Sequence, residues 1–152
     1  MALGRTHLLK MYIDGMELRT GEKAYHTDHS IVYSCHYHVI FCPKYRRPVL
    51  IDAVATRLKE LVREKQAEYG YTVMEMEVMP DHVHLLLDVD PRVGIAAVVA
   101  KIKGYTSHAF REQFPWLKKR LPTLWTRSKF IFTVGAVTLE TVQQYIASQK
   151  GV

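Results

Sequence analysis

The chain has 152 residues, of which 48% are hydrophobic and 24% are charged, as is ordinary for a soluble globular protein. This length fits one domain and is sufficient for a hydrophobic core that needs no stabilising disulfide or metal. The formal net charge of +6 and the isoelectric point near 9.3 favour a polyanionic partner, because lysine and arginine release counterions when they bind phosphates.

The hydropathy and the cysteine content of the sequence exclude several classes of protein. No stretch of the chain approaches the roughly 20 apolar residues that a membrane-spanning helix needs. We expect no secretory signal in the first residues, because polar side chains occupy the place of its apolar core. The two cysteines, Cys35 and Cys42, form no C-x-x-C pattern and fit neither a disulfide framework nor a zinc site. We therefore expect a cytoplasmic protein with no membrane partner and with both thiols reduced.

The first half of the chain predicts one strand and one helix. Residues 1–28 carry little pattern, and we expect a variable segment ahead of a single domain at residues 29–152. Residues 31–42 are rich in β-branched and aromatic side chains and end at a proline, which predicts a strand. Residues 50–70 predict an amphipathic helix, because apolar residues recur at helical spacing and a glycine closes the segment.

The next two segments predict a β-hairpin. In residues 71–79, Glu75 and Glu77 alternate with apolar residues, so we expect the glutamates on one face of a strand and on the other Met74, Met76 and Val78. A tight turn at Pro80-Asp81 leads into the second strand, at residues 82–89.

The remaining segments complete the order of elements. Residues 93–114 predict a helix, residues 129–137 a fourth strand and residues 138–149 a last helix, with a basic, aromatic connection ahead of the fourth strand. The order β-α-β-β-α-β-α predicts an α+β protein with the ferredoxin-like split β-α-β arrangement. That arrangement is an antiparallel sheet with two helices on one face, here followed by a C-terminal helix.

His82 and His84 are the sharpest candidates for a metal site. Alternate side chains of a strand share one face, so the two imidazoles point the same way and can bind one ion. The same spacing also occurs where two histidines are merely exposed, or where one of them caps a neighbouring carbonyl. A histidine-triad nucleotide hydrolase is excluded, because Leu86 occupies the place of its third histidine.

Tyr145 and Gln149 lie four residues apart and therefore on one face of the predicted last helix. Considered alone, this pair is typical of a half-buried tyrosine beside a solvated glutamine. Considered with the two histidines, it has a joint interpretation. Gln149 can offer its amide oxygen as a third ligand, while Tyr145 reaches a phosphate bound to the same ion.

These motifs resemble those of one family. The hairpin MEVMPDHVHLLL, the strand FIFTVGAV and the helix segment YIASQ resemble the HUH endonucleases, specifically the single-tyrosine TnpA transposases of small insertion sequences. The segments YHVIF and KYRRP also resemble the first strand and the following turn of that family, so that the resemblance spans residues 30–150.

The resemblance implies a role for each residue of the joint site. His82, His84 and Gln149 would be metal ligands, and Tyr145 would be the nucleophile that forms a 5′-phosphotyrosine with single-stranded DNA carrying hairpins. It also implies a homodimer with composite active sites, in which the tyrosine helix of one subunit completes the site of the other. We expect Mg²⁺ or Mn²⁺ as cofactor, with tighter binding of Mn²⁺ by histidine, and no small-molecule cofactor.

Basic and aromatic residues are candidates for DNA contacts, because cations bind phosphates and unpaired bases stack on aromatic rings. The candidates are Lys44, Tyr45, Arg46, Arg47, Lys101, Lys103 and Arg127. Each of them can equally be a solvated charge or a core aromatic.

Two other functions remain open at this point. One is a domesticated relative that acts on repeated chromosomal palindromes, and the other is a non-catalytic ferredoxin-like module that binds nucleic acid. A relaxase or replication initiator shares the histidine pair but is usually larger, with the motifs in a permuted order.

Overall fold

The computed structural model describes residues 26–28, 31–33, 35–133 and 147. Of the predicted last helix, only Ala147 belongs to this set, in helical conformation. Tyr145 and Gln149 lie outside the described residues.

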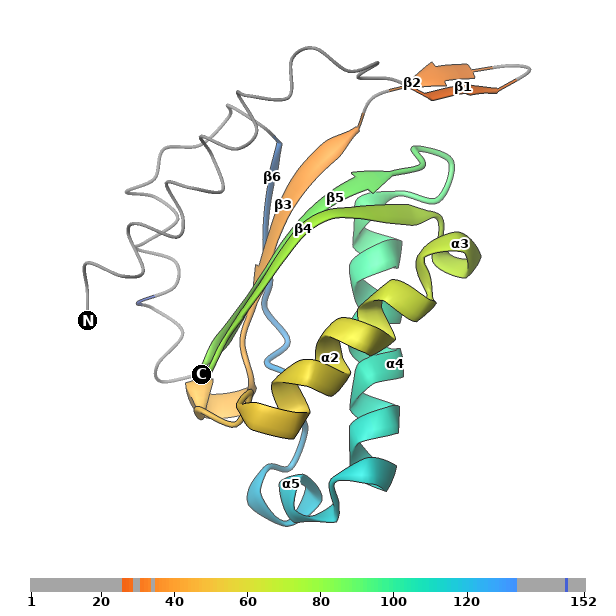
Figure 1. The fold of residues 1–152 in the computed structure, drawn as a ribbon. Coiled ribbons are helices and arrows are strands. Elements are labelled where there is room, and N and C mark those ends of the chain that lie inside the picture. Colours follow the sequence, from red (N-terminus) through yellow and green to blue (C-terminus); the bar gives the residue numbers. More distant parts are fainter. Residues whose placement is uncertain (1–25, 29–30, 34, 134–146, 148–152) are drawn as a thin grey trace.

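A four-stranded antiparallel sheet is the centre of the described structure (Figure 1). Its strands lie in the order β4-β5-β3-β6, with the bounds β3 His36–Phe41, β4 Tyr71–Met79, β5 His82–Val89 and β6 Phe130–Thr133. Strand β5 lies between β3 and β4, and β3 lies between β5 and β6, so each β-α-β unit encloses one strand of the other. The predicted α+β fold with a split β-α-β sheet is confirmed.

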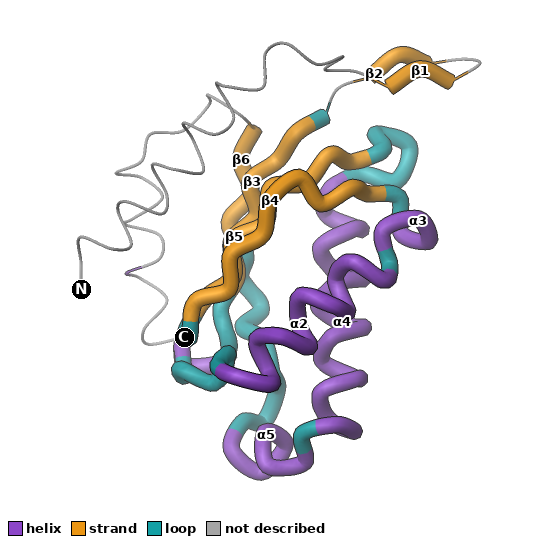
Figure 2. Tube along the Cα trace, viewed as in Figure 1, coloured by secondary structure: helices purple, strands orange, loops and turns teal. Residues whose placement is uncertain are grey.

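Helices cover one face of this sheet, as Figure 2 shows. The connection from β3 to β4 contains the short 3-10 helix η1 and the helices α2 and α3, and the connection from β5 to β6 contains α4 and α5. Their bounds are η1 Lys44–Arg46, α2 Asp52–Glu64, α3 Gln66–Tyr69, α4 Ile95–Gln113 and α5 Pro115–Arg120. Among the described residues, no helix combines the length and the apolar character that crossing a membrane requires.

The hydrophobic core lies between the sheet and the two long helices. Leu58 of α2 and Ile102 of α4 are almost fully buried there against alternate residues of β5, namely Val83, Leu85, Leu87 and Val89. Since successive side chains of a strand point to opposite faces, the residues between them must point away from the helices. Those residues are His82, His84, Leu86 and Asp88.

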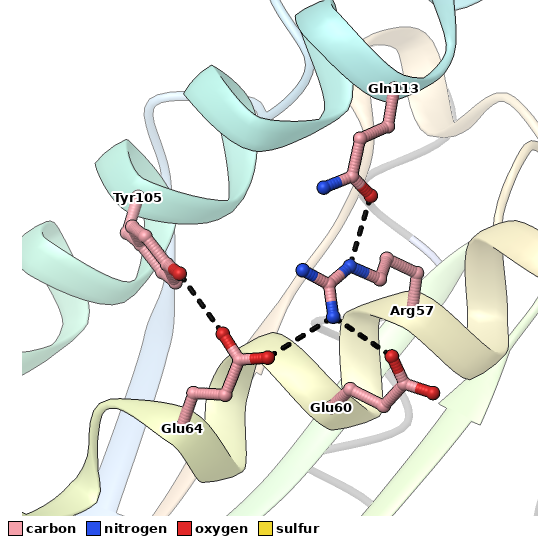
Figure 3. A network of polar contacts seen from close by, with 5 residues as sticks. All are labelled: Arg57, Glu60, Glu64, Tyr105 and Gln113. Carbon is pink, nitrogen blue, oxygen red and sulfur yellow. Dashed lines mark hydrogen bonds and ion pairs between the residues drawn. The ribbon is translucent and has the colours of Figure 1, made fainter.

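A polar network joins α2 to α4 on their outer side (Figure 3). The Arg57 guanidinium donates to Gln113 Oε1 at 2.9 Å, to Glu60 Oε2 at 2.9 Å and to Glu64 Oε1 at 3.1 Å. The Tyr105 hydroxyl donates to the second Glu64 oxygen at 3.0 Å. The network links the exposed sides of the two helices, whose packing rests on the buried core beneath them.

The structure differs from the predicted elements at four places. The predicted helix 50–70 is interrupted at Lys65 and forms α2 and α3. The predicted strand 31–42 is divided: β2 (Ile31–Tyr33) pairs with β1 (His26–Asp28) in a separate hairpin, and β3 joins the main sheet. The predicted connection ahead of β6 contains α5, which begins at a proline, a residue that suits the first position of a helix. A β-bulge interrupts β4 between Val73 and Glu75.

Candidate active site

The histidine pair lies on the face of the sheet that the helices do not cover. We call this the histidine face, and the described side chains that define it come from three strands: His38, Ile40, His82, His84, Leu86 and Phe132. Antiparallel pairing places Ile40 of β3 on one side of His84 and Glu77 of β4 on the other. A central strand of a regular ladder therefore positions both imidazoles, which leaves them little freedom to change direction.

The two rings are close and buried. His82 is 1% and His84 2% exposed, and their ring centroids are 4.8 Å apart with the ring planes at 74°. The prediction that the two side chains share one face is thus confirmed by the register. The alternative of an exposed pair on a strand is wrong, because neither ring is on the surface.

A carboxylate determines which nitrogen of His82 carries the proton. His82 Nδ1 lies 2.7 Å from Asp81 Oδ1, and a carboxylate can only accept, so Nδ1–H is the donor. In the neutral ring, Nε2 then keeps its lone pair for a metal ion. A carboxylate behind a metal-binding histidine is a recurring arrangement that orients the ring and raises its basicity as a ligand.

Burial keeps His84 and His38 uncharged near neutral pH. Burial, with the charges of His82 and His38, lowers the pKa of His84 to about 3. Burial also lowers the pKa of His38 to about 4, and its ring stacks on Phe132 with the centroids 4.8 Å apart. Neutral imidazole is the form that binds metal, so His84 needs no proton loss before it can act as a ligand.

The two histidines fit a divalent metal ion, but such an ion needs at least one further ligand. His82 and His84 would supply two nitrogen ligands, and no cluster of three or more His, Cys, Asp or Glu side chains suited to a metal occurs within the described ranges. Two imidazoles add no negative charge, which leaves the ion its full charge for a phosphate. The predicted third ligand, Gln149, lies outside those ranges and stays a prediction.

A buried arginine completes the surroundings of His82. Arg46 Nε lies 2.8 Å from Asp81 Oδ2, while Asp81 Oδ1 faces His82. Arg46 is 5% exposed and Asp81 8% exposed. The sequence pattern predicted a turn at Asp81 and a DNA contact at Arg46, and neither residue was predicted to lie beside His82. The one local signal for Asp81 is an acidic residue directly ahead of the histidine pair.

The other candidate DNA contacts divide into two groups in space. Lys44, Tyr45 and Arg47 lie in or next to η1, and the Tyr45 ring is 47% exposed. Arg47 also lines a surface hollow of about 380 Å³ together with Pro48, Val49 and Arg120. This group is contiguous with the histidine face through Arg46 and Asp81.

The second group lies on or beyond α4, on the helical side of the sheet. Lys101 is exposed and its ammonium lies 5.5 Å from the centre of the Tyr69 ring. Lys103 donates from Nζ to the carbonyl oxygens of Thr126 at 2.6 Å and Ser128 at 3.3 Å. Arg127 is exposed in the same connection. Lys103 therefore has a structural task in the described protein, and DNA contacts by this group stay predictions.

The fold and the buried histidine pair define a class, namely a ferredoxin-like domain whose central strand presents an H-x-H motif. The family model described as "Transposase IS200 like" matches residues 31–149. The chain belongs to this family, the single-tyrosine transposases of the HUH superfamily. It is therefore a transposase, an enzyme that cleaves and rejoins DNA.

Curated relatives agree with this assignment. The ISDra2 transposase TnpA of Deinococcus radiodurans is 43% identical over 120 residues, which cover 78% of this chain and 86% of that protein. The transposase for insertion sequence element IS200 of Salmonella typhimurium is 31% identical over 119 residues, covering 77% of this chain and 78% of that protein. Transposases of this family generally depend on a divalent metal ion.

Solved structures agree as well. The crystal structure of a Deinococcus radiodurans R1 protein assigned as a transposase superposes with a TM-score of 0.77 at 36% identity and covers 84% of this chain and 99% of that one. The structure of a REP-associated tyrosine transposase bound to a REP hairpin superposes with a TM-score of 0.53, covering 80% of this chain and 67% of that one. At 11% identity, this second likeness shows the fold alone.

Proposed function

We propose that this transposase cleaves and rejoins single-stranded DNA at the hairpin-marked ends of its insertion sequence, with Tyr145 as the nucleophile. The observation that carries the proposal is the histidine pair: two buried imidazoles on one strand, of which His84 is neutral and His82 is held through Nδ1 by Asp81, with Nε2 left to bind a metal ion. The relatives at 43% and 31% identity are insertion-sequence transposases, which favours this function over a domesticated relative.

His82, His84 and Gln149 would hold the divalent ion, Mg²⁺ or Mn²⁺. Such an ion supplies positive charge beside the non-bridging phosphate oxygens, which offsets their repulsion of an incoming nucleophile and contributes several kcal/mol. Mn²⁺ accepts nitrogen and oxygen ligands equally, whereas Mg²⁺ prefers oxygen, so we expect tighter binding of Mn²⁺.

The proposed chemistry conserves one phosphodiester bond at every step. The Tyr145 hydroxyl loses its proton and its oxygen attacks phosphorus. The bond from phosphorus to the 3′ oxygen breaks, and that oxygen leaves as a 3′-hydroxyl. The 5′ end stays attached as a phosphotyrosine, which a second 3′-hydroxyl attacks to release the tyrosine and reseal the strand. Because the bond energy is kept in the intermediate, rejoining needs no nucleotide cofactor.

Two observations support a DNA partner: the positive charge of the chain and the REP hairpin bound by a transposase of similar fold. The chain carries a net charge of +6, and the group at Lys44, Tyr45 and Arg47 combines cations with an exposed ring beside the histidine face. The REP-associated transposase of similar fold was solved with a hairpin bound. We further propose that the enzyme is a homodimer in which each tyrosine helix completes the partner subunit's site.

Covalent capture tests the proposal. End-labelled single strands that carry the hairpin of the element's end are incubated with the protein and Mn²⁺, and the products are separated under denaturing conditions. We expect a labelled protein–DNA adduct from the wild type and none from Tyr145→Phe, while the variant still binds the strand. Tyr69→Phe, on the helical side of the sheet, is the matched control and should form the adduct. An adduct from Tyr145→Phe would refute the assignment of the nucleophile.

A further inference from the structure

Arg46, Asp81 and His82 form a buried chain of contacts in which each carboxylate oxygen has its own partner. Arg46 Nε lies 2.8 Å from Asp81 Oδ2, and His82 Nδ1 lies 2.7 Å from Asp81 Oδ1. All three residues are at least nine-tenths buried. Asp81 thus connects the turn after β3 to the ring that faces the proposed metal site.

We infer that Arg46 is a positioning residue, which acts through Asp81 to hold His82 with its proton on Nδ1 and its Nε2 lone pair directed at the metal ion. The inference rests on the proposed function for the identity of His82 as a ligand. It assigns Arg46 to the metal site and not to a direct DNA contact.

The backbone around Arg46 supports a specific task for this side chain. Tyr45 has φ 58° and Arg46 φ 51°, so two consecutive residues other than glycine adopt the left-handed region. Such conformations are unfavourable and persist where neighbouring contacts hold them, often at functional sites. Here they direct two adjacent side chains differently: Tyr45 is exposed, while Arg46 is buried against Asp81.

Main-chain hydrogen bonds hold this turn to the hairpin that carries the histidines. Arg46 N donates to Pro43 O at 2.8 Å, which closes η1, and Leu50 N donates to Pro80 O at 3.0 Å. The second bond ties the segment after Arg46 to the turn that contains Asp81. The separation of the arginine and the aspartate is therefore fixed by backbone as well as by charge.

The remaining nitrogens of Arg46 argue against a purely structural role. Nη1 and Nη2 are buried and make no hydrogen bond within the described part of the chain, and Nε faces Asp81 as an ion pair without hydrogen-bond alignment. A buried guanidinium with one ionic contact is a poor way to gain stability, because its desolvation offsets most of the attraction. Its effect on Asp81 is direct, since the contact of Arg46 Nε with Oδ2 at 2.8 Å leaves Oδ1 turned toward His82 Nδ1 at 2.7 Å.

The experiment compares Arg46→Met and the charge-conserving Arg46→Lys with the wild type, after heteronuclear NMR spectra have established that each variant is folded. Arg47→Met is the matched control, because it removes the same charge from the same turn but from an exposed side chain. Two properties are measured without DNA: the ¹⁵N shifts of the His82 ring nitrogens in the metal-free protein, and the Mn²⁺ affinity by calorimetry.

We expect the wild type and Arg47→Met to show the proton of His82 on Nδ1. Arg46→Met should show loss of this single tautomer and a Mn²⁺ affinity lower by about 10- to 100-fold, as for other residues that orient a metal ligand. Arg46→Lys should recover part of both properties. Should Arg46→Met fail to fold, Arg46→Lys and Asp81→Asn are measured in its place. The amide of Asp81→Asn can present a donor to Nδ1 and move the proton to Nε2.

An unchanged tautomer and unchanged Mn²⁺ affinity in the folded variants would overturn the inference. So would an Arg46 variant that keeps both properties and loses only affinity for hairpin DNA in a separate binding measurement, because Arg46 would then be a DNA contact. The ¹⁵N measurement needs neither metal nor DNA. It therefore tests this inference independently of the proposed function. The proposed function is tested by whether the wild type forms a protein–DNA adduct and Tyr145→Phe does not.

Discussion

His84 is placed by the strand and kept neutral by its surroundings. It lies between Ile40 and Glu77 in the sheet, on the face opposite Val83, and burial holds its pKa near 3. His84 is therefore already deprotonated at physiological pH, and its nitrogen lone pair can bind a metal ion.

We predict that His84→Ala removes cleavage by either metal. Without the His84 ligand, the metal ion is no longer held in position beside the phosphate. The transition state then loses several kcal/mol of stabilisation, which corresponds to a rate lower by roughly 10²- to 10³-fold or more. The measurement is the rate of adduct formation with Mg²⁺ and with Mn²⁺.

His108→Ala is the control, since that side chain lies exposed on α4 and is 77% accessible. Thermal unfolding of both variants separates an effect on chemistry from an effect on folding. Cleavage by His84→Ala at the wild-type rate would remove the metal role from this residue.

At the scale of elements, the bulge in β4 decides which side chains accompany the histidines. Val73 pairs with Leu87 and Glu75 with Leu86, so the residue between them has no partner. Tyr71 and Val73 therefore share the core face with Met76 and Val78, although they are an odd number of positions away. The prediction that Met76 and Val78 lie opposite the two glutamates is correct, but Met74 does not join them, because an alternating pattern cannot reveal an extra residue.

Lys103 connects α4 to the segment that enters β6, and its charge state should affect stability. Burial, with the charge of Lys129, lowers the pKa of Lys103 from 10.5 to about 8. Between these values the unfolded chain binds a proton that the folded protein does not, so stability rises with pH across this window.

We predict that the unfolding free energy of the wild type, relative to Lys103→Met, increases as the pH rises from 8 to 10.5. Urea unfolding at a series of pH values measures the difference, and the difference between the two proteins removes the contribution of other titrating groups. Lys101→Met on the same helix, with an exposed side chain, is the control and should show a smaller pH dependence. A pH-independent difference for Lys103→Met would mean that its ammonium is not desolvated.

At the scale of the whole molecule, the question is which subunit supplies the tyrosine. If the sites are composite, as we propose, a heterodimer of Tyr145→Phe and His82→Ala subunits contains one site with both groups intact and one site lacking both. If each subunit is self-sufficient, every site in that heterodimer lacks one group.

We predict that mixing these two inactive variants restores about half of the wild-type adduct formation per heterodimer, because a two-fold dimer has two equivalent sites. Differently tagged subunits, purified through both tags, make the heterodimer unambiguous. Absence of adduct from verified heterodimers would place the tyrosine and the histidines of each site in the same subunit.

The sequence by itself determined the split β-α-β fold, the family and the shared face of His82 and His84, because strand alternation and short motifs are local properties. It could not determine that Arg46 lies against Asp81, since 35 positions separate them and only the pairing of β3 with β5 brings their turns together. The depth of the histidine pair was likewise decided by packing: an imidazole two residues from another can be exposed or buried, and in the folded protein His82 is 1% and His84 2% exposed, which lowers the pKa of His84 to about 3.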